Sequence, residues 1–174
     1  RYMAPEQWTS ASTVDARVPD GPSTPMYRSC SEQPPPNAYI PANTTPTGTC
    51  GTLAAGTNTI TSSSRQREFI LVVPNAPAPT ETFPILFMWH WIGGSANGFL
   101  ERGAVQSAAD AQRFIAVIPV ARGATVFGTS FDTRWPFDVT QSAARMAEEF
   151  VFFDDMLGCV QEQFAINNAC VSTI

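Results

Sequence analysis

Short apolar runs separated by helical patterns are the feature that most restricts the fold of this chain. Residues 85–90 and 114–119 are almost wholly apolar and lack the alternation of a half-exposed strand, which is typical of strands buried on both faces of a parallel sheet. Residues 68–73 are rich in β-branched side chains and end at Pro74, which predicts another strand. Because strands that alternate with helices indicate βαβ units, we expect an α/β fold with a mostly parallel sheet and flanking helices.

Two helices are predicted between these strands. The first covers residues 103–112, and the second precedes a further strand at 169–174. In the second helix, apolar side chains spaced four or three residues apart form one continuous stripe: Met146, Phe150, Phe153, Leu157, Val160 and Phe164. Glu148, Glu149 and Asp154 lie off this stripe. Adjacent helical positions point in different directions, so we expect Asp154 and Asp155 to be solvated or capping residues rather than a catalytic pair.

The opening of the chain has a different composition. Residues 1–64 are rich in Pro, Ser, Thr and Gly and show no sustained apolar period, which predicts a loop stapled by a disulfide. We therefore expect two parts, a loop-rich segment at 1–64 and the body of an α/β domain at 65–174.

The charge balance excludes some partners. The chain has 10 basic and 15 acidic residues, a net charge of -5, and no block of arginines that could neutralise phosphates. No apolar run approaches the roughly 18 to 20 residues of a membrane helix. We expect neither a nucleic acid nor a membrane as a partner.

The cysteines point to an oxidising compartment. The chain has four of them, Cys30, Cys50, Cys159 and Cys170, with no C-x-x-C spacing. With a single histidine in the chain, a zinc site is not expected, and neither is any other metal or cofactor. Two disulfides are the simplest account and predict a secreted, extracellular or periplasmic protein. We favour the sequence-local pairs Cys30 with Cys50 and Cys159 with Cys170. The alternative is buried free thiols in a cytosolic protein.

Two segments resemble α/β-hydrolases of the polyhydroxyalkanoate-depolymerase and feruloyl-esterase group. They are residues 90–96, HWIGGSA, which follow a predicted buried strand, and residues 149–157, EFVFFDDML, which precede another. In that group the first motif is His-Gly followed by a loop of small residues, and the second lies in the helix that leads to the nucleophile strand. The similarity covers roughly residues 65–174, so the resemblance implies the N-terminal half of an α/β-hydrolase domain.

The resemblance also implies an oxyanion hole. When a serine attacks an ester, negative charge develops on the carbonyl oxygen, and one fixed N–H donor lowers the barrier by on the order of 3 kcal/mol. The backbone of Trp91 and Ile92 would supply such donors, with His90, Gly93 and Gly94 supporting the loop. In these families the catalytic histidine comes late in the chain, so His90 is expected to order the loop and not to act as a base.

Trp91 stands where the family pattern has glycine. Its indole is expected either to close over the cleft or to pack as an ordinary core aromatic.

A further loop, at residues 121–140, follows the end of a predicted strand. It carries Asp132, Arg134 and Trp135, which we expect to form part of a substrate-binding wall. The alternative is a surface loop with one internal contact between the arginine and a carboxylate.

The chain contains no Gly-x-Ser-x-Gly. Because the triad of the fold follows the order serine, acid, histidine, the resemblance implies no catalytic residue in this chain and a nucleophile just after Ile174. We expect a second chain or segment to complete the fold. A cleaved precursor, a fragment and a degenerate relative are three explanations.

Three functions are therefore compared. The first is a secreted serine ester hydrolase acting on a polyester or on feruloyl or acetyl esters. The second is a non-catalytic secreted binding or structural module on a degenerate hydrolase scaffold. The third is a peptidase, because the acyl-transfer machinery of the fold is shared.

Overall fold

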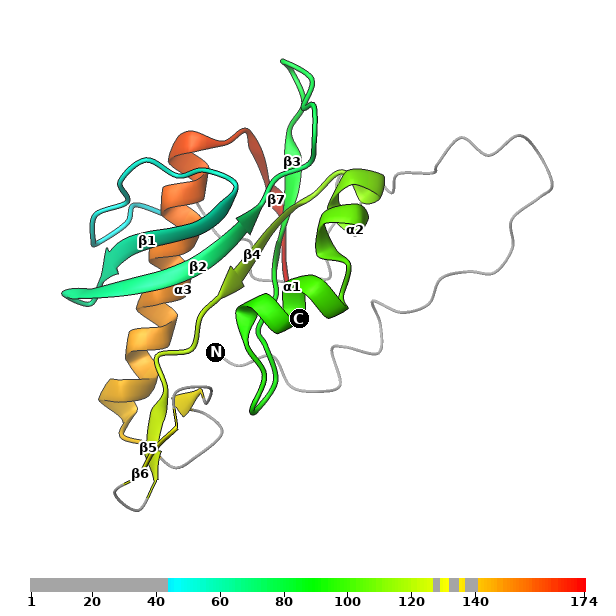
Figure 1. Ribbon diagram of the computed structural model, residues 1–174. Helices are drawn as coiled ribbons and strands as arrows, with labels where there is room; N and C mark the ends of the chain where they lie inside the picture. The colour runs from blue at the N-terminus through cyan, green and yellow to red at the C-terminus, as the bar shows by residue number, and fades with distance from the viewer. Residues whose placement is uncertain (1–43, 127–128, 132–134, 137–140) are drawn as a thin grey trace, which may run out of the picture. The chain divides into compact units, whose positions relative to one another are not determined.

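The computed structural model describes residues 44–126, 129–131, 135–136 and 141–174. Five strands form one sheet in the order β1-β2-β4-β3-β7 (Figure 1). Their bounds are Gly56–Ser62 for β1, Arg65–Val72 for β2, Phe83–Phe87 for β3, Ile115–Pro119 for β4 and Ile166–Thr173 for β7. Because β2 runs antiparallel to both of its neighbours, the other four strands point in one direction. The predicted α/β fold with a mostly parallel sheet is confirmed.

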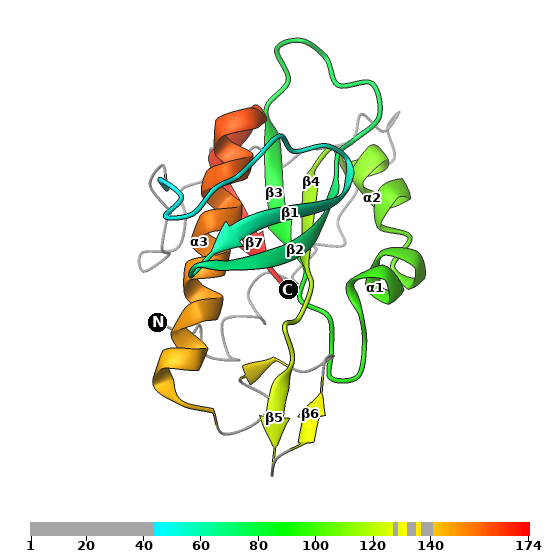
Figure 2. The ribbon, with the colours of Figure 1, turned by 60° about the vertical axis from the view of Figure 1, so that its left-hand side comes forward.

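Helices cover both faces of this sheet (Figure 2). Helix α3, Ala143–Gln163, lies on one face, and helices α1, Ala96–Arg102, and α2, Val105–Gln112, lie on the other. Alternate side chains of β2 point to opposite faces of the sheet. Phe69 packs in the hydrophobic cluster that includes α3, and Ile70 packs in the one that includes α1 and α2. The inner strand β4, whose five residues are all buried, therefore lies between the two layers of helices.

The carboxyl ends of β3, β4 and β7 lie at one edge of the sheet, which we call the carboxyl edge. A short hairpin, β5 at Ala124–Val126 and β6 at Thr129–Phe131, follows β4 there. In open α/β sheets this is the edge at which ligands bind.

The loop predicted for residues 1–64 was wrong at 56–62, where β1 pairs along its whole length with β2. Three side chains of β1 point inward, namely Asn58, Ile60 and Ser62, and two of them are polar. Asn58 is satisfied locally, because its amide bonds the backbone of Ala54 and Gly56. With one apolar residue on its buried face, the strand has no hydrophobic period to reveal it.

The helix predicted at 103–112 is present as α2, and helix α1, which precedes it, was not predicted. Helix α1 begins after Ser95, whose Oγ accepts a hydrogen bond from the amide of Gly98 at 3.0 Å. Ala104, at a φ of +44°, separates it from α2. Glycine lowers helix propensity, and Gly98 thus weakens the sequence pattern of α1.

The predicted long helix is present as α3, but its buried face is rotated from the predicted stripe. Leu157 and Val160 are buried as expected, whereas Phe150 is 47% exposed. Glu149 and Asp155, by contrast, are each 1% exposed. The expectation of a solvated or capping Asp155 was wrong, because its Oδ1 accepts hydrogen bonds from the amide and the hydroxyl of Thr47, at 2.6 and 2.9 Å.

The predicted cysteine pairs are also wrong. Cys50 is bonded to Cys159, 109 residues further on, which excludes both sequence-local pairs. Cys170 is disulfide-bonded as well, and Cys30 lies outside the described residues.

Tertiary contacts explain this pairing, because the segment that precedes β1 runs along α3. The amide of Thr44 bonds Gln161 Oε1 and that of Leu53 bonds Gln163 Oε1, each at 2.9 Å. The contact is so close that a Cβ at Gly158 would lie 2.6 Å from the carbonyl oxygen of Thr44.

Candidate active site

The predicted oxyanion loop begins where β3 ends, between β4 and β7. The amide of Met88 donates to the carbonyl of Val117, and that of Trp89 donates to the carbonyl of Ile174, both at 2.9 Å. The amide of Ile174 in turn donates to the carbonyl of Phe87 at 2.9 Å. The loop at residues 90–94 therefore starts at the carboxyl edge, beside the tip of β7.

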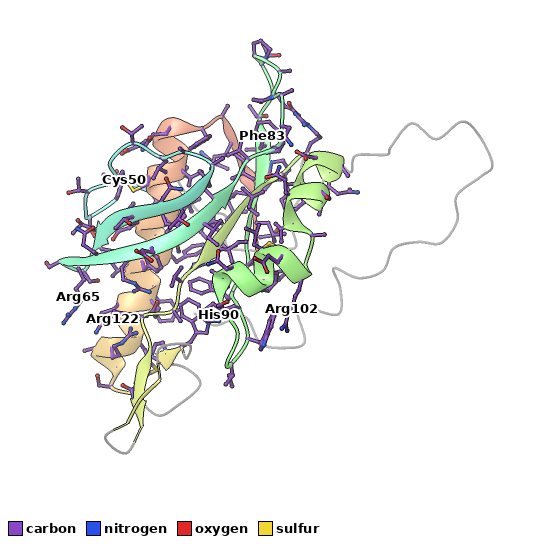
Figure 3. All side chains as sticks on the ribbon, in the orientation of Figure 1. Cys50, Arg65, Phe83, His90, Arg102 and Arg122 are labelled. Atoms are coloured by element: carbon purple, nitrogen blue, oxygen red, sulfur yellow. A yellow bond between two sulfur atoms is a disulfide. The ribbon has the colours of Figure 1, made fainter. Side chains whose placement is uncertain are left out.

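His90 lies inside this loop and is 3% exposed. Figure 3 places it at the end of the sheet opposite Phe83. Its Nε2 accepts a hydrogen bond from the amide of Ala121 at 3.3 Å, and its Nδ1 lies 3.1 Å from the carbonyl oxygen of Trp91. Because an amide can only donate, Nε2 is the acceptor, and the ring proton sits on Nδ1 and is donated to Trp91. Both ring nitrogens are occupied within the fold.

These bonds fix the peptide between Trp91 and Ile92. The carbonyl of Trp91 also accepts a hydrogen bond from the amide of Gly94 at 2.9 Å. In a trans peptide the C=O and N–H groups point in opposite directions, so a carbonyl held toward His90 turns the amide of Ile92 away from the loop. Within the described ranges of the chain, neither the Trp91 nor the Ile92 amide donates a hydrogen bond.

The side chain of Trp91 lies against α1. Its ring centroid is 5.9 Å from that of Phe99 and 5.7 Å from the guanidinium carbon of Arg102. A Cβ at Gly94 would lie 2.8 Å from the indole, so a side chain at this position would displace the indole from its place. Gly93, at a φ of +75°, makes the turn that places the two together. The indole is nevertheless 47% exposed, and the side chain of Ile92 is 54% exposed.

Trp135 contacts the loop at 90–94 through His90. It is buried, and its indole N–H donates to the carbonyl of His90 at 2.8 Å. Its ring centroid lies 4.9 Å from those of both Trp89 and His90. Trp89 is held in turn by a 2.9 Å hydrogen bond to the hydroxyl of Thr173 at the end of β7. The role predicted for Trp135 in substrate binding stays a prediction, and Asp132 and Arg134 lie outside the described residues.

Sequence reasoning missed a group of paired charged side chains that connects β2, α3 and the segment after β4. Glu149 of α3 binds two arginines, Arg67 of β2 at 2.7 Å and Arg145 of α3 at 2.6 Å. Arg145 also donates to the carbonyl of Gly123 at 3.1 Å, and Arg122 pairs with Glu148. Burial lowers the pKa of Arg67, and the charge of Glu149 opposes that shift. The i,i+4 spacing of Arg145 and Glu149 was the one signal in the sequence.

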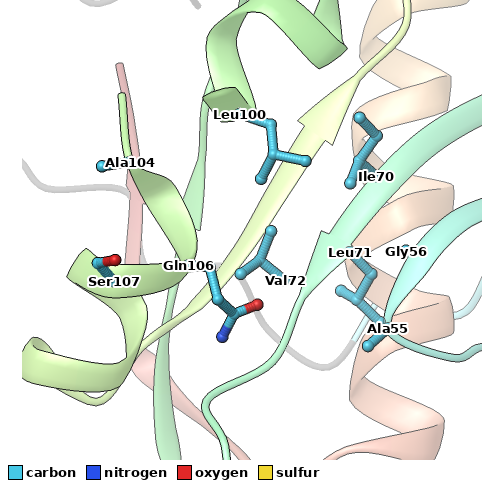
Figure 4. Close-up of a pocket in the computed structure, with 9 residues that line it drawn as sticks. All are labelled: Ala55, Gly56, Ile70, Leu71, Val72, Leu100, Ala104, Gln106 and Ser107. Carbon is cyan, nitrogen blue, oxygen red and sulfur yellow. The ribbon is translucent and has the colours of Figure 1, made fainter. Parts of the chain in front are cut away.

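A cavity of about 230 Å³ lies elsewhere, between β2 and helices α1 and α2 (Figure 4). Its walls include Ile70, Val72 and Leu100, and no residue of the loop at 90–94 lines it. It is thus separate from the candidate oxyanion loop.

In the part of the chain that is described, no cluster of three or more His, Cys, Asp or Glu side chains could hold a metal ion. No helix among these residues is long and apolar enough to cross a bilayer.

No protein-family model matches the chain, and no curated protein matches it in sequence. Solved structures do match its fold. The crystal structure of native sOPH has a TM-score of 0.50 and 17% identity, over 71% of this chain and 44% of that one. Native pOPH has a TM-score of 0.51 and 17% identity, over 76% and 46% of the two chains. A ferulic acid esterase has a TM-score of 0.51 and 18% identity, over 67% and 46%.

The chain therefore spans less than half the length of each of these three structures. At these identities the likeness shows the fold, which is of the α/β-hydrolase type.

Proposed function

We propose that this chain supplies the oxyanion-hole half of a secreted serine ester hydrolase. One observation carries the proposal. The loop at the carboxyl edge is fixed by hydrogen bonds to His90 and Gly94, yet the amides of Trp91 and Ile92 donate no hydrogen bond among the described residues. Donors that are held rigidly in this way suit an oxygen whose charge grows during a reaction. A ferulic acid esterase has the same fold, which supports this class of reaction.

In the proposed reaction, a serine attacks the ester carbonyl and the free amides stabilise the resulting oxyanion. The alcohol then leaves, and water hydrolyses the acyl-enzyme. His90 does not serve as the base, because Nε2 accepts from Ala121 and the Nδ1 proton is donated to Trp91. The base, the acid and the nucleophile come from residues beyond Ile174. The ester is a polyester or a feruloyl or acetyl ester.

The strand pairing of β7 supports a further segment that completes the fold. Among the described strands β7 is an outer strand that pairs with β3 alone, and an outer strand is where a sheet can be extended. Ile174, next to the oxyanion loop, is 41% exposed. A serine a few residues after Ile174 would lie close to the amides of Trp91 and Ile92, and a second chain or a later segment would pair with the edge of β7.

Secretion is part of the proposal. The bond between Cys50 and Cys159, together with the bonded Cys170, supports an oxidising compartment, where such bonds persist.

A two-part experiment tests the function. The coding sequence after Ile174 is read first, and a Gly-x-Ser-x-Gly is expected within a few residues. The longer protein is then treated with a serine-directed fluorophosphonate, and we expect a labelled serine in that motif and turnover of short p-nitrophenyl esters. Absence of the motif, of labelling and of turnover would instead favour a binding module on a degenerate scaffold. Labelling with peptide cleavage but no ester turnover would favour a peptidase.

A further inference from the structure

We propose that Glu149 and Arg145 are positioning residues for the oxyanion loop. Glu149 is 1% exposed, although a carboxylate is costly to bury, and it binds the guanidinium groups of both Arg67 and Arg145. A buried ion pair is often no more stabilising than apolar residues of similar volume. A role in fixing a particular geometry explains its presence better than a contribution to stability.

Arg145 connects Glu149 on α3 to the backbone just after β4. Its Nη1 bonds Glu149 at 2.6 Å while its Nη2 bonds the carbonyl of Gly123 at 3.1 Å. Glu149 thus holds one branch of the guanidinium fork and orients the other toward the backbone after β4. On the other side of the carboxylate, Arg67 anchors Glu149 to β2 and lies 3.8 Å from the centre of the Phe152 ring.

The same backbone segment holds His90. Two residues before Gly123, the amide of Ala121 donates to Nε2 of His90. This hydrogen bond keeps the proton on Nδ1, which in turn holds the carbonyl of Trp91 and so sets the direction of the Ile92 amide. A second ion pair, between Arg122 and Glu148, ties the same segment to α3. His90 and Arg122 lie at the same end of the sheet in Figure 3.

Through these contacts, the charge of Glu149 on α3 determines which ring nitrogen of His90 carries the proton. The relation to catalysis rests on the proposed function. The claim that Glu149 and Arg145 set the position of the His90 proton does not rest on the proposed function. It is testable on the full chain without any ester.

His90 is the single histidine of the chain, so its ring gives one unambiguous set of nitrogen signals. The experiment records the imidazole ¹⁵N spectrum, the coupling between Nε2 and the Ala121 nitrogen across their hydrogen bond, and the exchange rate of the Ala121 amide. The variants are R145Q, R145K and E149Q. The control is R113Q, which removes an arginine that pairs with Glu81 at 2.6 Å and is not part of these contacts.

In the wild-type chain we expect the Nδ1–H tautomer and a measurable coupling. In R145Q and E149Q we expect a population of the Nε2–H tautomer, loss of the coupling, and exchange of the Ala121 amide that is faster by about tenfold or more, since local opening becomes more frequent. R145K keeps the charge but loses the planar fork and is expected to restore the wild-type signals in part. R113Q is expected to leave all three signals unchanged.

The proposal is overturned if R145Q and E149Q fold and keep the wild-type tautomer and exchange rate, or if R113Q changes the signals as much as they do. If E149Q does not fold, R145Q decides, because Arg67 still neutralises Glu149 in that variant. An inactive but correctly folded hydrolase with normal His90 signals would count against the proposed function and leave the positioning role intact.

Discussion

The indole nitrogen of Trp135 lies 2.8 Å from the carbonyl oxygen of His90, 45 positions earlier in the chain. Both residues are buried. This hydrogen bond joins the region after the β5–β6 hairpin to the oxyanion loop, so the rigidity of that loop depends on residues far from it in sequence.

Replacing Trp135 tests how much the fold depends on this hydrogen bond. In W135F the carbonyl of His90 loses its donor inside the fold, and we expect the free energy of unfolding to fall by about 1 to 3 kcal/mol. Denaturant unfolding measures the change. W91F is the matched control, because the indole of Trp91 is half-exposed and donates no hydrogen bond among the described residues, and its effect should be smaller. Equal losses in the two variants would contradict the account.

Amide exchange tests the state of the oxyanion loop in the chain alone. The amides of Trp89 and Gly94 are hydrogen-bonded, whereas those of Trp91 and Ile92 donate to no acceptor in the described part of the chain. Hydrogen exchange followed by NMR should therefore show slow exchange at the first two positions and fast exchange at the other two. Protection of the Ile92 amide equal to that of Gly94 would mean that it is bonded internally.

The disulfide between Cys50 and Cys159 makes a separate prediction. It closes a loop of 109 residues, and in the chain-entropy model a loop of about this length is worth about 4 to 5 kcal/mol. Replacing both cysteines by alanine should lower the free energy of unfolding by an amount of that order. Peptide mapping without reduction should first show a fragment that links the two positions. A fragment linking Cys30 to Cys50 would refute the pairing.

Glu81 links stability to pH. A hydrogen bond from Arg113, supported by one from the amide of Ala78, lowers the pKa of Glu81 to about 2. Because this pKa is below its value in the unfolded chain, the contact stabilises the fold above about pH 4.5, and that contribution is lost as the pH falls toward 2. A carboxyl titration by NMR should give the low pKa in the wild type and a value near the ordinary one in R113Q. An unchanged pKa in R113Q would show that Arg113 is not the cause.

The sequence predicted those parts of the fold whose side chains carry a regular apolar pattern. The runs at 68–73, 85–90 and 114–119 lie in or overlap β2, β3 and β4, and the long periodic segment is α3. These elements are buried by their own apolar residues, and a local pattern is therefore enough to reveal them.

The parts that could not be predicted depend on partners far away in sequence. Asp155 is buried because Thr47 satisfies it, and Glu149 is buried because Arg67 does. Cys50 reaches Cys159 because the segment before β1 runs along α3. A local pattern contains none of these partners. The glycine-rich loop was recognised from its residues, whereas the direction of its amides followed from hydrogen bonds to His90 and Gly94 that sequence alone does not give.

The central claim is that the amide of Ile92 stabilises an oxyanion, and the kcat of the completed protein for a short p-nitrophenyl ester tests it most directly when I92P is compared with I92A. Proline removes the amide hydrogen, whereas alanine keeps it and removes the same exposed side chain. We predict that I92A retains most of the wild-type kcat and that I92P loses about 10²- to 10³-fold. Equal kcat values for folded I92P and I92A, or no ester turnover by the completed wild-type protein, would contradict the claim.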